Sequence, residues 1–159
     1  MLGIISDTHE NIEAMKKAAA IFKNKKVDFA VHCGDIGSPM ALESFKGLKM
    51  KLVFGNYDAE RIGLINKCRE LGFGEIKDEL EFEFKNKKFY AYHGTNIKKL
   101  DAAIKSNKYD YILTGHTHIK RNEQIGRTRV INPGALTRAH QHTIALLDAE
   151  KNKLEFLKI

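Results

Sequence analysis

At 159 residues, the chain is long enough to form one domain around a hydrophobic core, and we expect a single domain over residues 1–159. Hydrophobic residues make up 43% of the chain and charged residues 30%, and no apolar run reaches the roughly 18 residues of a membrane span. The formal charge of +7 comes mostly from scattered lysines. We therefore expect a diffuse field that attracts small anionic substrates, with no nucleic-acid-binding surface and no membrane association.

Cysteine content and the N-terminal segment both bear on the cellular compartment. The two cysteines, Cys33 and Cys68, are too few for a disulfide framework. The segment from Met1 to Asp7 lacks the basic region and apolar stretch of a secretion signal. We expect two reduced thiols in a cytoplasmic protein.

The first half of the chain alternates short apolar runs with segments of helical periodicity. Each predicted strand is followed by a polar loop and then a helix, with Ser38 as the expected N-cap of the second helix. We expect strands at 1–6, 27–32 and 52–54 and helices at 11–24, 39–46 and 61–71. This order predicts an α/β sheet with crossover helices, in which functional residues follow the C-terminal ends of the strands.

From residue 80 onward, the sequence changes to the alternation typical of paired strands. We expect a hairpin with its turn at Asn86 and Lys87. Further strands are predicted at 80–84, 89–92, 111–114, 121–125, 128–132, 143–148 and 154–157, and a helix at 96–106. The expected α/β fold is therefore two packed mixed β-sheets flanked by helices.

Metal-compatible side chains follow five of the predicted strands. They are Asp7, His9, Asp35, Asn56, His93, His116 and His118. Oxygen and nitrogen donors without a thiolate favour Mn²⁺, Fe²⁺, Zn²⁺, Co²⁺ or Ni²⁺ over Ca²⁺ or Mg²⁺. Seven donors exceed what one ion needs and suit two ions that share a carboxylate, an arrangement used to hydrolyse phosphate esters.

Each of these residues also has a structural interpretation. Asp7 and Asn56 suit helix caps or turns, and a single His-x-His sequence is also compatible with ordinary loop histidines. We expect His32, inside a strand, to be a packed histidine. His140 and His142 form a second His-x-His sequence, which we assign to a loop or an edge strand and exclude from the metal ligands.

The ordered motifs resemble the signature of the calcineurin-like metallophosphoesterases. They are Asp7-x-His9, Gly34-Asp35, Gly55-Asn56-x-Asp58, His93-Gly94 and Gly115-His116-x-His118, in this order along the chain. The short length and the later Asn132-Pro133-Gly134 are similar to the small bacterial and archaeal phosphodiesterase branch, to which a scaffold subunit of the retromer is related. The resemblance extends from Asp7 to about Asp148.

The resemblance implies a four-layer αββα sandwich and a phosphodiesterase, with weak monoesterase activity as an additional expectation. It makes Asp7, His9 and His118 ligands of one divalent ion and Asp35 a bridge. A second ion would be held by Asn56, His93 and His116, the two ions activating a bridging hydroxide that attacks phosphorus. Mn²⁺ is the favoured metal, with Ni²⁺, Fe²⁺, Zn²⁺ and Co²⁺ as alternatives.

Two positions depart from the family pattern. We expect Asn56, Tyr57 and Asp58 to be the catalytic residues. Many members of the family have histidine where this chain has Tyr57, and many small members have a second histidine where it has Thr95. A phenol is a weaker proton donor than imidazolium at neutral pH, so protonation of the leaving group is the step most affected. His32 and His140 are the alternative candidates for this proton donor.

Two other function classes fit parts of the sequence. A scaffold like the retromer subunit would keep the fold and a remnant of the site, whereas a nuclease is suggested by net charge alone. The complete set of seven donors favours the enzyme, because a scaffold does not need all of them. We expect a small phosphodiester substrate and a homodimer.

Overall fold

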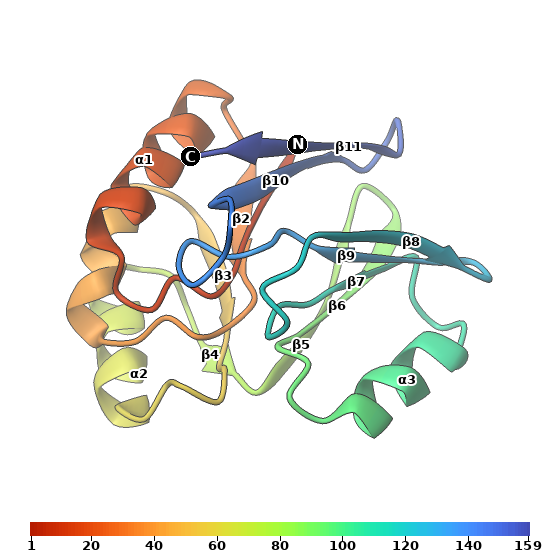
Figure 1. Cartoon of the computed structure of the whole chain (residues 1–159), viewed down its shortest axis with the longest axis horizontal. Coiled ribbons are helices and arrows are strands. Elements are labelled where there is room, and N and C mark those ends of the chain that lie inside the picture. The colour runs from red at the N-terminus through yellow and green to blue at the C-terminus, as the bar shows by residue number, and fades with distance from the viewer.

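The computed structural model describes residues 1–159 and contains two β-sheets (Figure 1). The larger sheet has the strand order β11-β10-β1-β2-β3-β4, and the smaller has the order β5-β6-β7-β9-β8. The strands of the larger sheet are β1 (Leu2–Ile5), β2 (Phe29–His32), β3 (Met50–Val53), β4 (Ile76–Lys77), β10 (Thr143–Asp148) and β11 (Lys153–Lys158). Those of the smaller sheet are β5 (Glu79–Phe84), β6 (Lys87–Tyr92), β7 (Tyr111–Leu113), β8 (Arg121–Ile125) and β9 (Thr128–Asn132).

The helices lie on the outer faces of the two sheets. In Figure 1, α1 (Ile12–Asn24) and α2 (Arg61–Glu70) cover the larger sheet, and α3 (Ile97–Lys105) covers the smaller one. Three apolar clusters fill the interfaces: one under α1 and α2, one between the sheets, and one under α3. The predicted fold, two packed mixed sheets in a four-layer αββα sandwich, is confirmed.

Helix α1 shows how the sequence specifies these layers. The Asn11 side chain accepts a hydrogen bond from the backbone N–H of Ala14 and caps the helix. Met15, Ala18 and Phe22 recur on one face and are buried against the sheet. Gly3 of β1 leaves room for this packing, since a Cβ there would lie 2.7 Å from the Phe22 ring.

Several predicted details of the fold are wrong. The segment Pro39–Phe45 is a 3₁₀-helix, and the side chain of Ser38 makes no capping hydrogen bond. The hairpin turn lies at Lys85 and Asn86, one residue earlier than expected, because β5 and β6 pair Phe84 with Lys87. Both turn residues have positive φ, at 53° and 58°, as a two-residue turn with the right twist requires. The two-residue strand β4 was not predicted.

Parallel pairing places the functional loops at one end of the sandwich. Strands β1, β2 and β3 run parallel in the larger sheet, and β6 runs parallel to β7 in the smaller sheet. Their C-terminal ends therefore meet, and all five loops that follow them border one site.

None of the helices has the length and apolar character needed to span a membrane.

Candidate metal centre

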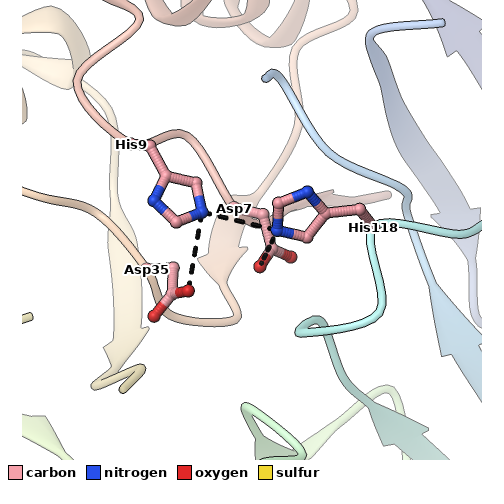
Figure 2. Close-up of side chains that lie close together, drawn as sticks. All are labelled: Asp7, His9, Asp35 and His118. Atoms are coloured by element: carbon pink, nitrogen blue, oxygen red, sulfur yellow. Dashed lines mark hydrogen bonds and ion pairs between the residues drawn. The ribbon is translucent and has the colours of Figure 1, made fainter. Parts of the chain in front are cut away.

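Four of the predicted ligands converge on one point. The ligand atoms of Asp7, His9, Asp35 and His118 all lie within 4.8 Å of one another, and we call these residues the first cluster. Figure 2 shows their side chains pointing toward a common centre from three loops. His118 Nε2 lies 3.2 Å from an oxygen of Asp7, and His9 Nε2 lies 3.4 Å from His118 Nε2. This is a tetradentate set of oxygen and nitrogen donors.

The second cluster consists of Asn56, His93 and His116, and it is less compact. His93 Nε2 lies 3.1 Å from the amide oxygen of Asn56. His93 Nδ1 donates to the backbone carbonyl of Cys33 at 2.8 Å, which leaves Nε2 as the nitrogen that faces the site. His116 is exposed and meets His93 only through the rings, whose centroids are 5.1 Å apart.

Asp35 connects the two clusters. One carboxylate oxygen, Oδ2, lies 3.5 Å from His9 Nε2, whereas Oδ1 lies 3.3 Å from His93 Nε2. The backbone N–H of Tyr57 donates to Oδ1 at 2.8 Å and fixes the orientation of the carboxylate. One side chain therefore presents one oxygen to each cluster, as a bridging ligand must.

Asp58 holds the loops that carry these ligands. Its two carboxylate oxygens accept four backbone N–H groups, from Asp35, Ile36, Gly37 and Gly55, at 2.7–3.1 Å. These bonds tie the loop after β2 to the loop after β3. Because both oxygens are occupied and the side chain is buried, these contacts give Asp58 a positioning role.

The backbone of the site is strained. Asp7, His9, Asp35, His116 and His118 all have φ between 39° and 69°, in the left-handed region. For residues other than glycine this region costs roughly 1–3 kcal/mol each, and it persists only where surrounding contacts impose it. Such strain is typical of functional sites.

Two glycines allow the loops to approach the carboxylates. A Cβ at Gly55 would lie 2.0 Å from Asp35 Oδ1. A Cβ at Gly115 would lie 1.9 Å from Ser6 Oγ and 2.7 Å from Asp7 Oδ2. Any larger residue before Asn56 or before His116 would therefore clash with these side chains, which explains the glycines in the motifs Gly55-Asn56 and Gly115-His116.

Burial and charge shift the pKa values of the candidate ligands in different directions. Burial raises the pKa of the Asp7 carboxyl and lowers that of the His9 imidazole, the latter against the opposing charges of Asp35 and Asp7. Burial also acts to lower the pKa of His93, but the hydrogen bond and charge of Asp35 outweigh it and raise that pKa. His93 consequently holds its proton more strongly than His9.

The donor set fits divalent cations. Asp7 and Asp35 are both buried, and no lysine or arginine pairs with either; their only partners in ion pairs are histidines. Buried carboxylates of this kind require a compensating positive charge. Imidazole and carboxylate donors are compatible with Mn²⁺, Fe²⁺, Co²⁺, Ni²⁺ or Zn²⁺.

The structure distinguishes the three candidate proton donors, His32, Tyr57 and His140. His32 is fully buried, accepts a hydrogen bond from Gly34 N–H on Nδ1, and lies 3.1 Å from Thr8 Oγ1 through Nε2. Burial lowers its pKa to about 3, so it is a packed neutral imidazole and not the acid. Tyr57 is 46% exposed, with its ring against His9 at a centroid distance of 4.6 Å.

His140 belongs to a groove that the sequence analysis did not identify. The groove has a volume of about 690 Å³ and shares His118 with the first cluster. Arg138 also lines it, with its guanidinium carbon 5.8 Å from the centroid of the Tyr57 ring. The sequence signal was the Arg138-to-His142 stretch, in which only the histidines were considered.

Comparisons of sequence identify relatives over most of the chain. A family model described as the calcineurin-like phosphoesterase superfamily domain matches residues 1–152. A phosphodiesterase of Methanocaldococcus jannaschii is 35% identical in an alignment 159 residues long, which covers 96% of this chain and 95% of the relative. A probable metallophosphoesterase of the same organism is 31% identical over 141 residues, covering 86% and 68%.

Comparisons of structure agree with this result. An archaeal phosphodiesterase of known structure has a TM-score of 0.94 at 32% identity, and the match covers 99% of each chain. Vps29 of Chaetomium thermophilum has a TM-score of 0.73 at 12% identity, covering 99% of this chain and 96% of its own. At that identity, the likeness to Vps29 extends to the fold alone.

Proposed function

The chain belongs to the calcineurin-like phosphoesterase superfamily, and from this premise we propose that it is a phosphodiesterase that uses two divalent metal ions to hydrolyse small phosphodiesters. The observation that carries the proposal is the orientation of Asp35, whose two oxygens face different clusters. A carboxylate that served a single ion would have no need of this double orientation.

Asp7, His9, Asp35 and His118 would hold one ion, and Asp35, Asn56, His93 and His116 the other. When bound, such ions polarise phosphoryl oxygens and lower the pKa of water. Mn²⁺ is the favoured metal. Ni²⁺, Fe²⁺, Zn²⁺ and Co²⁺ are alternatives, because the same donors accept each of them.

The other side chains of the site position the substrate. If the amide oxygen of Asn56 faces a metal ion, its two N–H donors are free to bind a phosphoryl oxygen, a contact that aspartate could not make. Tyr57 places its phenol at the exposed rim of the first cluster, where its hydroxyl makes no hydrogen bond within the protein. It is therefore available to a leaving group.

A scaffold role is not favoured. The likeness to Vps29 concerns the fold, whereas the relative at 35% identity is a phosphodiesterase. The chain also retains the compact first cluster and the strained backbone around it, which a scaffold would not need.

Hydrolysis of bis(p-nitrophenyl) phosphate by metal-depleted protein, with Mn²⁺ or Ni²⁺ added back, tests the proposal. We expect no turnover without metal and turnover that rises with metal until two ions are bound per chain, as counted by mass spectrometry of the metal content. Folded protein that binds metal and remains inactive with every metal tried would support the scaffold instead.

Three further expectations stay predictions. A cytoplasmic location is supported by Cys33 and Cys68, which are both buried free thiols rather than a disulfide. The homodimer and the weak monoesterase activity require a mass measurement in solution and an assay with p-nitrophenyl phosphate, respectively.

A further inference from the structure

The groove beside the first cluster is large enough for a substituent of the substrate. Residues 117–120, residues 138–141 and Thr143 line it, and His118 belongs both to the groove and to the first cluster. Its volume of about 690 Å³ lies within the range of small-molecule sites. A phosphoryl group held at the clusters would therefore direct one of its ester substituents into this groove.

The charges in the groove all have one sign. Arg138 and Lys120 line it, and no aspartate or glutamate does. Neither cation forms an ion pair with a carboxylate; Arg138 lies over the ring of Tyr57, and the ammonium of Lys120 lies 5.7 Å from the centroid of the Phe156 ring. Unpaired cations around a concave surface raise the local concentration of anions.

The loop that carries Arg138 is anchored next to the metal ligands. Leu136 N–H donates to the backbone carbonyl of Asp7, and Asn11 donates to the carbonyl of Leu136. Ala135 and His142 form an isolated β-bridge that closes the base of the loop. Arg138 itself has φ of 49°, an unfavourable backbone conformation for arginine that the anchored loop imposes.

We propose that this groove binds a second anionic group of the substrate, a phosphate or a carboxylate carried by one ester substituent, and that Arg138 selects for it. Its planar guanidinium matches the paired oxygens of either anion. The inference rests on the proposed phosphodiesterase function and adds the substrate class. The preferred substrate is a phosphodiester with an additional negative charge a few bonds from the scissile phosphorus.

Three diesters with the same p-nitrophenyl leaving group test the inference. The other substituent is ethyl, 2-carboxyethyl or 2-phosphoethyl, so that the esters differ in the added anion. We expect kcat/KM of the metal-loaded protein to be about tenfold higher for at least one anionic ester than for the ethyl ester, as for one charged hydrogen bond. The two anionic esters then distinguish phosphate from carboxylate.

Arg138→Met keeps the length of the side chain and removes its charge. We expect the ratio of kcat/KM between the preferred anionic ester and the ethyl ester to fall toward one, and Lys120→Met to lower it less. Arg69→Met, on the exposed side of α2, is the matched control and should keep the ratio of the unaltered protein.

The outcomes separate this inference from the proposed function. Hydrolysis of the ethyl ester tests the phosphodiesterase itself, whereas the ratio tests the groove. Equal kcat/KM for all three esters in the unaltered protein would overturn the inference while leaving the phosphodiesterase intact. A ratio that survives in the folded Arg138→Met and Lys120→Met double variant would overturn it as well.

Discussion

The two clusters of the metal centre differ in how far they are formed before any metal binds. In the first cluster, four ligand atoms lie within 4.8 Å of one another, and both carboxylates are buried. In the second, His93 contacts Asn56 and Asp35, but His116 is exposed and its side chain meets the others only at the His93 ring. The same set of loops therefore produces one compact and one open group of donor side chains.

Because the clusters differ in this way, we expect the two ions to bind with different affinities. A preorganised set of donors loses less conformational freedom on binding than a set that must first converge. His9, whose pKa is lowered by burial, has little proton to release before it binds a metal ion. His93 must release a ring proton that the hydrogen bond and charge of Asp35 stabilise. We expect the first cluster to fill at lower metal concentration.

Asp35→Asn should have the largest effect, because only Asp35 faces both clusters. The amide keeps the shape of the side chain but removes the charge that both ions would share. We expect loss of both ions and a decrease in kcat of at least about 10²-fold, beyond the effect of a residue that only supports a ligand. Metal content and bis(p-nitrophenyl) phosphate turnover measure the two effects.

Asp101→Asn, on the exposed face of α3, is the control for Asp35→Asn and should behave as the unaltered protein. Full metal content in the Asp35 variant would show that the two clusters do not share this ligand.

A matched pair of histidine variants separates the clusters. His118→Gln should remove the tighter of two binding steps in calorimetric titration with Mn²⁺, whereas His116→Gln should remove only the weaker step. The reason is that His118 belongs to the compact cluster and His116 to the open one. If both variants lose the same step, the assignment of the two histidines to different ions is wrong.

The pH dependence of metal binding should also differ between the clusters. The raised pKa of His93 means that a proton competes with the second ion until the pH exceeds that value, whereas the lowered pKa of His9 leaves the His9 imidazole without a competing proton at neutral pH. Through that range, the affinity of the second step should rise by up to about tenfold per pH unit.

Titration calorimetry in buffers of different ionisation enthalpy counts the protons released in each step. Equal release in both steps would contradict the predicted difference. The stability of the metal-free protein should change with pH in the opposite direction to metal affinity. The raised pKa of His93 stabilises the fold at pH below 6.5, and this contribution to the free energy of unfolding is lost as the pH rises through the folded-state pKa.

Tyr57→Phe should have the smallest effect on the centre, because Tyr57 borders the first cluster without contributing a side-chain ligand. If its phenol protonates the leaving group, the variant should lose about tenfold in kcat on an alkyl diester and almost nothing on a p-nitrophenyl diester. Metal binding should not change. Equal rates of both proteins on the alkyl diester would exclude Tyr57 as the acid and direct attention to His140.

The layers and the edge that carries the site could be predicted because both depend on local patterns. Alternation in residues 79–84 and helical spacing in α1 specify their elements, and ligands directly after parallel strands must meet at one edge of a sheet. The family and the phosphoester chemistry could be predicted because the motifs follow one another in a fixed order along the chain. The comparisons confirm both.

The parts that could not be predicted depend on contacts between distant loops. The sequence shows Asp58 only as part of the motif Gly55-Asn56-x-Asp58. Its four hydrogen bonds from backbone N–H groups form only when the loops after β2 and β3 come together. Arg138 reaches the site because Leu136 bonds to the backbone of Asp7, nearly the whole chain length away. The strand β4 has only two residues, too few to produce a periodic pattern.

The most direct test is anomalous diffraction from crystals of metal-depleted protein soaked in Mn²⁺, first at a limiting concentration and then in excess. We predict one peak among Asp7, His9, Asp35 and His118 at the limiting concentration, and in excess a second peak among Asn56, His93 and His116, with Asp35 between the two. A single peak at every concentration would contradict the proposed two-metal centre, and so would two peaks that place the ions out of contact with the Asp35 carboxylate.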